Sequence, residues 1–298
     1  MKNNLRGKLK VLPFLMKPCY KQMPWGGEKL NLLYGKNSEF KLAGESWEAA
    51  DHKNGKTFAA NGIFKGFSLN KLGRILKAEP FPVLFKLIDA REKLSLQVHP
   101  TDELAVNDNG KNEMWIILSC MEDSVLYLGF EKKISKEEYK ARILNNTLEE
   151  VLKKVTVKKG EAYYLPAGLV HAIGGGIVIA EIQQNSDATY RISDWGRLGI
   201  DSKPRQLHIE ESLEATNIDA EPIVIKNGID FACPYFTARR EEIIGTKIIE
   251  ITGMTIVFIE EGIGKLKKGD TFIIPPGIKK VKITNATVIL FGKGKVCM

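Results

Sequence analysis

Runs of β-branched and aromatic residues alternate with turn residues along most of the chain, and they predict a protein built mainly from β-strands. Apolar runs of about four to eight residues, a length typical of buried strands, recur within residues 81–118, 155–194 and 231–296. Residues 7–66 are interrupted by Gly, Pro and Asn, and they predict further strands and loops. Strand-rich blocks at both ends with helices between them indicate β-barrels with a helical cover.

Three segments have helical spacing and strong helix formers. They span residues 69–77, 135–154 and 208–214. The second begins at Ser135 and has Glu138 three residues later, which is the capping-box arrangement that satisfies free N–H groups at the start of a helix. Helices are therefore expected to be a minor part of the fold.

A nine-residue pattern occurs twice and indicates an internal repeat. Residues 160–168 read Gly-Glu-Ala-Tyr-Tyr-Leu-Pro-Ala-Gly, and residues 269–277 read Gly-Asp-Thr-Phe-Ile-Ile-Pro-Pro-Gly. Each copy follows a Lys-Lys pair, and we interpret the two as copies of one barrel corner. The third residue after the first copy is His171, but the third residue after the second copy is Lys280. Only the first copy can therefore supply a histidine to a metal site.

The length of 298 residues exceeds the usual size of a single core, so we expect two packed units. The first, residues 1–225, is predicted to be a metal-binding catalytic domain with helical elements. The second, residues 226–298, is predicted to be a smaller β domain. The repeat supports this division because each unit contains one copy.

The net charge of +8 favours anionic partners such as phosphorylated small molecules. Lysines occur singly or in pairs near acids, without the clustering typical of nucleic-acid-binding proteins, so we expect no nucleic-acid partner. The four cysteines lie far apart without CxxC pairs, as expected for free thiols in a reducing compartment. The apolar run 11–16 contains Pro13 and is far shorter than the roughly 20 residues of a membrane span. We therefore expect a cytoplasmic protein without a membrane partner.

Residues 94–100, Leu-Ser-Leu-Gln-Val-His-Pro, alternate apolar and polar side chains. Successive side chains of a strand point to opposite faces, so Ser95, Gln97 and His99 share one face, and the leucines and the valine share the other. Taken alone, this pattern is also typical of a half-exposed strand in an antiparallel sheet.

Two further residues extend this polar face into a candidate metal site. Glu113 begins the apolar run 114–118, where a buried carboxylate needs a partner or a metal ion. His171 follows the first repeated corner and precedes a predicted strand over residues 173–179. Two imidazoles and a carboxylate from three strands, with the amide of Gln97 beside them, suit a divalent-metal site with room for substrate.

Residues 179–195 begin as a strand, turn abruptly polar and return through Thr-Tyr-Arg. This pattern is typical of a barrel mouth where side chains meet a ligand, and the alternative is a solvated hairpin in which Arg191 is incidental. The chain has four histidines. We interpret the two outside the metal site, His52 and His208, as surface or capping side chains.

Motifs along nearly the whole chain carry a family resemblance. They are Trp25-Gly26-Gly27, Glu45-Ser46-Trp47-Glu48, Gln97-Val98-His99-Pro100, Lys111-Asn112-Glu113, Leu165-Pro166-Ala167-Gly168 with His171, and Gln184-Asn185-Ser186-Asp187-Ala188-Thr189-Tyr190-Arg191. With these motifs the chain resembles the type I phosphomannose isomerases of the cupin superfamily, in their short bacterial form. The resemblance implies two cupin-type, jelly-roll β-barrels with a few short helices, the second barrel being degenerate.

The resemblance also implies one zinc ion per chain. Its ligands would be His99, Glu113 and His171, with Gln97 as the fourth. Asn112 stands where the family more often has proline or threonine. This departure concerns the wall of the pocket and does not touch a ligand.

The remaining site residues are also implied by the resemblance. Arg191 corresponds to the catalytic arginine, and Lys111 and Glu181 correspond to residues near the reacting carbons. Ser95 and Arg197 lie near the positions used for phosphate. With both barrel histidines assigned to the metal, Glu181 and Lys111 remain alternative candidates for the general base.

The activity that the resemblance implies is the interconversion of mannose 6-phosphate and fructose 6-phosphate through an enediolate. The partner is then a small sugar phosphate, and the sequence makes no prediction of oligomeric state. Two alternatives remain open at this point. One is a metal-dependent cupin oxygenase, because two histidines and a carboxylate also bind non-haem iron. The other is a sugar-phosphate-binding cupin without catalytic activity.

Overall fold

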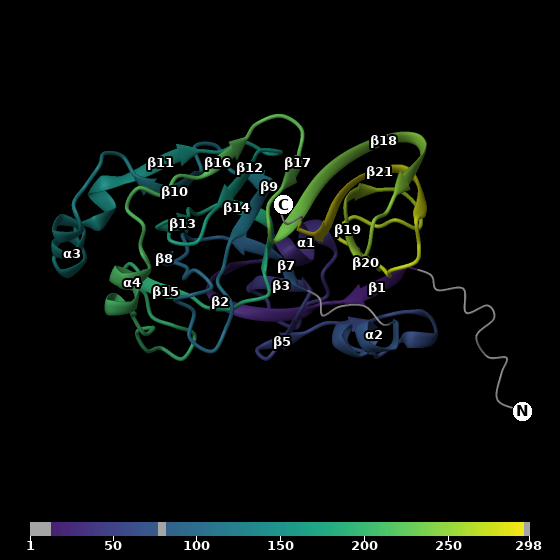
Figure 1. Ribbon diagram of the computed structural model, residues 1–298, viewed down its shortest axis with the longest axis horizontal. Coiled ribbons are helices and arrows are strands. Elements are labelled where there is room, and N and C mark those ends of the chain that lie inside the picture. The colour runs from purple at the N-terminus through teal and green to yellow at the C-terminus, as the bar shows by residue number, and fades with distance from the viewer. Residues whose placement is uncertain (1–12, 77–81, 295–298) are drawn as a thin grey trace, which may run out of the picture.

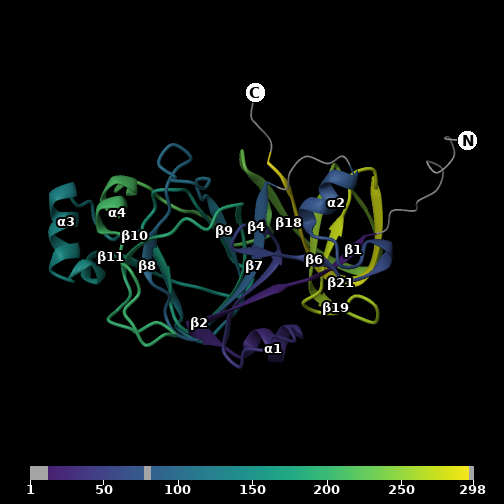
Figure 2. The same ribbon diagram turned by 90° about the horizontal axis from the view of Figure 1, so that it is seen from below.

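The chain folds mainly into antiparallel β-sheets, which confirms the predicted fold class. The structure is a computed structural model that describes residues 13–76 and 82–294. Predictions for residues 7–12, 77–81 and 295–296 lie outside the described residues. Figures 1 and 2 show long C-terminal strands packed beside the sheets formed by the middle of the chain.

Three main sheets contain most of the described strands. The central sheet has the order β16 (Ile223–Ile225), β12 (Ala162–Leu165), β9 (Glu113–Cys120), β14 (Ile177–Gln184), β7 (Val83–Ala90), β2 (Cys19–Gly27) and β3 (Ala43–Ala49). The five-stranded sheet has the order β11 (Leu152–Thr156), β10 (Val125–Phe130), β13 (His171–Ile173), β8 (Leu96–Val98) and β15 (Tyr190–Ser193). The C-terminal sheet has the order β17 (Asp230–Ala232), β18 (Phe236–Glu250), β21 (Lys280–Lys293), β19 (Thr255–Gly262), β20 (Thr271–Ile274), β1 (Phe14–Lys17) and β6 (Phe58–Ala59). A small fourth sheet pairs β4 (Asp51–His52) with β5 (Gly55–Lys56).

The described helices are short. They are α1 (Lys29–Tyr34), α2 (Leu69–Leu76), α3 (Lys136–Leu144) and α4 (Ile209–Ala215), with 3₁₀ turns at Gly62–Phe64 and Leu148–Val151. Helix α1 lies in a region predicted to hold only strands and loops. No helix in the described part of the chain is both long and apolar enough to span a membrane.

The predicted helix over residues 135–154 was too long. Ser135 caps α3 by accepting a hydrogen bond from the N–H of Glu138, as the capping box predicts. The helix ends at Leu144 with Asn145 as its C-cap, and Asn146 has a left-handed φ of 55°. Asparagine tolerates this conformation and is a poor helix former, so the chain turns there. Leu152 then begins β11, which pairs with β10.

A second correction concerns the strand predicted over residues 173–179. The structure has two strands there, β13 ending at Ile173 and β14 starting at Ile177. Three glycines, residues 174–176, form the turn between them. Glycine lowers strand stability and favours turns, so the apolar pattern was interrupted where the glycines occur.

The central sheet uses its two faces differently. Along β14, Val178, Ala180 and Ile182 belong to the core shared with the C-terminal sheet. Ile179 belongs to the core shared with the five-stranded sheet, and Glu181 points to that same side because side chains alternate. The face that carries functional groups is therefore the one covered by the five-stranded sheet.

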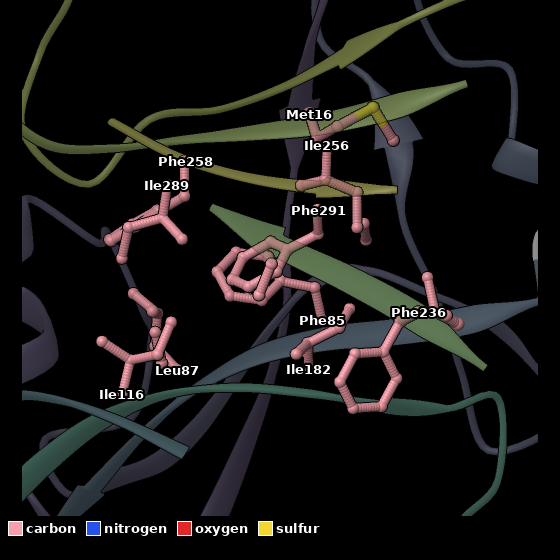
Figure 3. Close-up of a cluster of buried hydrophobic side chains, with 14 of the residues drawn as sticks. Met16, Phe85, Leu87, Ile116, Ile182, Phe236, Ile256, Phe258, Ile289 and Phe291 are labelled. Atoms are coloured by element: carbon pink, nitrogen blue, oxygen red, sulfur yellow. The ribbon is translucent and has the colours of Figure 1, made fainter. Parts of the chain in front are cut away.

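The core between the central and C-terminal sheets is built on aromatic side chains. The ring of Phe85 on β7 lies 5.5 Å from that of Phe258 on β19 and 4.8 Å from that of Phe291 on β21, measured between centroids. Figure 3 shows these rings between Leu87 and Ile182 of the central sheet and the strands of the C-terminal sheet. Fully burying one such side chain contributes about 1.5–3 kcal/mol to folding stability. This core therefore stabilises the central sheet on the face opposite the functional groups.

The two nine-residue segments adopt the same backbone arrangement, which confirms the predicted repeat. The N–H of Gly160 donates to the carbonyl of Ile117, and the N–H of Gly269 donates to the carbonyl of Ile259, both at 2.8 Å. Each glycine precedes a short strand, β12 or β20. The final glycine of each segment has a left-handed φ, 88° in the first copy and 97° in the second.

The C-terminal sheet includes strands from the beginning of the chain. On β1, Phe14 pairs with Ile273 of β20, and Met16 pairs with Ala59 of β6. Both views show β1 beside the C-terminal strands (Figures 1 and 2). The division of the chain after residue 225 stays a prediction, and these pairings cross it.

A buried ion pair joins the second repeated corner to the central sheet. The ammonium of Lys36 lies 2.8 Å from the carboxylate of Glu48 on β3, with side-chain exposures of 6% and 0%. Lys36 also donates to the carbonyl of Gly269, and Thr271 donates to Glu48 at 2.8 Å. The pair is thus surrounded by the hydrogen bonds that a buried charge requires.

We predict that Glu48→Gln lowers the free energy of unfolding by about 3 kcal/mol, because it leaves the buried ammonium of Lys36 without a countercharge. Denaturant unfolding measures this change. The control is Glu250→Gln, which breaks an exposed pair with Lys280 and should cost less than about 1 kcal/mol. Equal losses in the two variants would contradict the assignment.

Candidate active site

Three potential metal ligands converge between the central and five-stranded sheets. They are His99, just after β8, Glu113 at the start of β9, and His171 at the start of β13. One ligand atom from each lies within 4.8 Å of the others, and all three side chains are buried. The Nε2 atoms of His99 and His171 lie 3.3 and 3.4 Å from the two carboxylate oxygens of Glu113.

Backbone carbonyls orient both imidazoles. Nδ1 of His99 lies 2.8 Å from the carbonyl of Ala188, and Nδ1 of His171 lies 2.8 Å from the carbonyl of Leu169. A carbonyl accepts, so Nδ1 carries the proton, and the lone pair of a neutral imidazole is on Nε2. Burial lowers the pKa of His99 to about 3, with a further contribution from Lys111, and burial also lowers the pKa of His171. Both rings are neutral at pH 7 and point their lone pairs at one place.

The first repeated corner connects the two imidazoles. The N–H of Gly168 donates to the carbonyl of His99 at 2.9 Å, and three residues later the chain reaches His171. Gly168 has a φ of 88°, which a side chain would strain. The corner therefore fixes the two histidines relative to each other.

The carboxylate of Glu113 is short of hydrogen-bond donors. Both its oxygens are buried and accept no hydrogen bond within the described part of the chain, although Nζ of Lys111 lies 3.0 Å away. Burial alone would raise its pKa, but the ammonium of Lys111 outweighs burial and holds the pKa well below its usual value. A buried, ionised carboxylate facing two imidazole lone pairs fits a divalent cation, whose charge balances it.

Gln97 lies beside this group. Its amide nitrogen is 3.3 Å from Nε2 of His171 and 3.5 Å from Nε2 of His99. The oxygen and nitrogen of the amide exchange places on a half-turn, so Gln97 can present its oxygen to a cation. Ser95 donates to the amide oxygen at 3.2 Å, and after the half-turn its hydroxyl can accept from the amide nitrogen instead.

A cavity of about 290 Å³ opens beside the metal ligands. Its volume is at the small end of ligand cavities. It brings together five residues singled out from the sequence, which are Ser95, Gln97, Lys111, Glu181 and Arg191. Arg197, the other residue predicted near phosphate, lines a different surface cavity with Trp195.

A network of buried charges forms the wall of this cavity on the central sheet. Nζ of Lys86 lies 3.1 Å from Glu181 and 3.9 Å from Glu45, and Nζ of Lys111 lies 4.0 Å from Glu181. The indole N–H of Trp115 donates to Glu181 at 3.0 Å. Burial, and then the negative charge of Glu113, raise the pKa of Glu181 to about 7. A carboxyl group with this pKa can accept or release a proton near neutral pH.

Four charged residues of the cavity were not predicted as site residues. Lys86 is one of two charges, with Asp89, in the otherwise apolar strand 83–90, a signal like the one that identified Glu113, so the sequence could have revealed it. Glu45 and Asp187 each belong to a family motif but were given no role. Arg205 lies in an irregular polar segment, where no local pattern marks it.

The other two histidines differ from their predicted roles. His52 is buried rather than on the surface, and its Nε2 lies 3.2 Å from Asp108. His208 precedes α4 but makes no capping bond with its side chain. Instead, its Nδ1 accepts a hydrogen bond from the N–H of Arg191 at 3.2 Å. The polar surroundings of each ring come from distant parts of the chain.

Comparison with known proteins identifies the family. The family model of the type I phosphomannose isomerase catalytic domain matches residues 14–123. Mannose-6-phosphate isomerase ManA from Bacillus subtilis is 34% identical over 302 residues, which cover 91% of this chain and 95% of the relative. The chain belongs to the type I phosphomannose isomerase family. A second relative, the mannose-6-phosphate isomerase of Streptococcus mutans, is 33% identical over 95% of this chain and 98% of its own length.

Solved structures agree with this assignment. The mannose 6-phosphate isomerase of Bacillus subtilis superimposes with a TM-score of 0.83 at 29% identity, covering 95% of this chain and 100% of that one. A variant of phosphomannose isomerase from Salmonella typhimurium, at 17% identity, has a TM-score of 0.76, covers 96% and 100%, and shows the fold alone. The named relatives are aldose–ketose isomerases. Because this chain belongs to the same family, it is an enzyme of this class.

We predict that His171→Ala weakens the binding of a divalent cation by about 100-fold or more, since loss of even an outer-sphere partner can cost that much. Equilibrium dialysis with Co²⁺, followed by metal analysis, measures the affinity. His52→Ala is the matched control because it also removes a buried imidazole, and it should bind Co²⁺ as the parent chain does. Normal Co²⁺ binding by the His171 variant would argue against this metal site.

Proposed function

We propose that this chain interconverts mannose 6-phosphate and fructose 6-phosphate and uses one zinc ion per chain. The observation that carries the proposal is the convergence of His99, Glu113 and His171 beside a cavity that also holds Glu181 and Arg191. The reaction moves a proton between C1 and C2 of the sugar while negative charge develops on an oxygen. It therefore requires a base, fixed positive charge and a place for the phosphate.

Zinc suits this set of ligands. His99, Glu113 and His171 would hold it, with the amide oxygen of Gln97 as a fourth ligand, and nitrogen and oxygen donors of this kind are usual for zinc. When bound, zinc supplies a Lewis acid that polarises the substrate oxygens. The ligands come from both sheets, so the same packing that builds the fold also sets the distances between them.

Arg191 supplies fixed positive charge from the five-stranded sheet. It pairs with Gln97 across strands β15 and β8, which places it one strand away from a proposed ligand. Its Nη1 donates to the carbonyl of Gln206 at 2.8 Å, and its buried Nε has no hydrogen-bond partner in the described structure. Buried donors are normally satisfied, so this N–H is suited to an oxygen of the substrate.

Glu181 is the group best placed to move the proton. Trp115 and Lys86 hold its carboxylate, and its pKa of about 7 allows both protonation states near neutral pH. Lys111 contacts Nε2 of His99 at 2.8 Å and lies close to Glu181. Its ammonium can therefore stabilise the ionised form of Glu181 or an adjacent substrate oxygen.

A cytoplasmic location is part of the same proposal. Cys19, Cys120 and Cys233 are free thiols, as expected in a reducing compartment.

We predict that Arg191→Ala lowers kcat by about 10²–10³-fold while zinc remains bound, because the variant removes a donor to developing charge and no metal ligand. A coupled assay for fructose 6-phosphate measures kcat, and metal analysis measures zinc. In the same assay a chelator should abolish activity, and added zinc should restore it. Loss of zinc from the Arg191 variant would show that its assigned role is wrong.

We predict that kcat/KM rises with pH along an acidic limb set by Glu181. The pKa of this carboxyl is raised, so it is protonated below about 7 and becomes a base as the pH increases through that value. A bound cation offsets the charge of Glu113, so the limb is expected at or below 7. Glu181→Gln should lower kcat and remove the limb, and a limb that survives in this variant would exclude Glu181 as the base.

A further inference from the structure

Arg205, and not Arg197, lines the candidate active-site cavity. It lines the cavity with Arg191 and Ser95, whereas Arg197 lines a separate surface cavity. Both are about equally covered, with side-chain exposures of 16% for Arg205 and 15% for Arg197. The two arginine side chains therefore differ in the cavity that they line and not in how deeply they are buried.

One buried carboxylate holds both arginines. Nε and Nη2 of Arg205 each lie 2.6 Å from a different oxygen of Asp194, which is a bidentate fork. Nη2 of Arg197 lies 2.6 Å from Asp194 as well, and its Nη1 donates to the carbonyl of Lys93 at 2.6 Å. Asp194 is only 6% exposed. Two N–H donors of Arg205 are used by this fork, and its other donors are not needed for it.

The backbone fixes the segment that carries Arg205. The carbonyl of Gln206 accepts from Arg191, and the N–H of His208 donates to the carbonyl of Arg191 at 2.8 Å. Residues 205–208 therefore run along β15. The backbone bonds of Gln206 and His208 hold the segment, and Asp194 holds the guanidinium of Arg205, which limits the entropy lost on binding a ligand.

The charges of the cavity are separated. Two of the three acids that line it, Glu45 and Glu181, pair with Lys86. The third, Asp187, accepts a hydrogen bond from the amide of Asn54 at 2.7 Å. On the arginine side, Asp194 is the carboxylate in contact with Arg205, and no carboxylate contacts Arg191 within the described residues. This side carries excess positive charge, and planar guanidinium groups suit the oxygens of a phosphate.

We propose that Arg205 binds the phosphate of the sugar phosphate, and that Asp194 is a positioning residue that holds its guanidinium in place. This inference rests on the proposed function for the identity of the sugar. It assigns Arg197 to the outer side of the same carboxylate, away from the substrate.

Binding of a ligand that cannot isomerise tests the proposal directly. The probe is mannitol 6-phosphate, which has no carbonyl group, and mannitol is the reference compound. Isothermal titration calorimetry should show that Arg205→Gln weakens binding of mannitol 6-phosphate roughly 30-fold or more, because one partner of a charge-assisted pair is lost. Binding of mannitol should change little.

Further variants test whether Asp194 acts by positioning the guanidinium of Arg205 and whether any nearby arginine would serve equally well. Asp194→Asn should raise KM for fructose 6-phosphate more than it lowers kcat, and Asp194→Glu should restore part of the loss. Arg197→Gln should weaken the binding of mannitol 6-phosphate clearly less than Arg205→Gln does. The matched control is Arg240→Gln, which breaks a similar fork to buried Glu260 in the C-terminal sheet and should leave affinity unchanged.

The outcomes distinguish this inference from the proposed function. If the parent chain isomerises fructose 6-phosphate but Arg205→Gln binds the probe normally, only the phosphate assignment fails. If the parent chain binds the probe through Arg205 but does not isomerise, only the proposed activity fails. Failure of the parent chain to bind the probe, or an equal loss in Arg197→Gln, overturns the inference. Arg205→Lys, which keeps the charge but loses the fork, replaces the glutamine variant if that variant does not fold.

Discussion

The hydrogen bonds from Nδ1 of His99 and His171 to backbone carbonyls are the constraint on which the site depends. They select the tautomer, orient both rings and direct two lone pairs towards Glu113. Both carbonyls belong to irregular segments. That of Leu169 lies at the first repeated corner, and that of Ala188 lies two residues after Ser186. Ser186 in turn donates to the carbonyl of Asn109 at 2.7 Å. Turn conformations far apart in the sequence thus determine where a cation would bind.

The central sheet separates two kinds of chemistry. One face carries Phe85 and Leu87 and packs on the C-terminal sheet, and the other carries Lys86 between them in the sequence. Burying charges such as Lys86 and Glu181 is unfavourable unless they are paired. The aromatic core on the opposite face stabilises the same strands and allows these charges to remain in the interior. The alternation of a single strand therefore provides both the stability and the site.

Much of the fold and the metal site could be predicted from the sequence because they depend on local patterns. Strand alternation placed Gln97 and His99 on one face, and the repeated corner identified His171. The end of α3 depended on the conformation of Asn146, and the Arg205 position depended on pairing between distant segments. Periodicity does not report such long-range pairings. The two glycine corners, by contrast, share a local turn, in which the N–H of Glu161 donates to the carbonyl of Lys158 and that of Asp270 to the carbonyl of Lys267, because this conformation is set by the corner's own residues.

The pairing of β1 with β20 has a consequence for how the protein is made. Phe14 finds its partner only at Ile273, near the other end of the chain. During synthesis β1 can pair early with β6, but its pairing with β20 must wait until residue 273 has left the ribosome. Contacts that join such distant residues slow folding, because a long loop must close first. The interval in which an unpaired edge is open to aggregation is consequently set by the rate of translation.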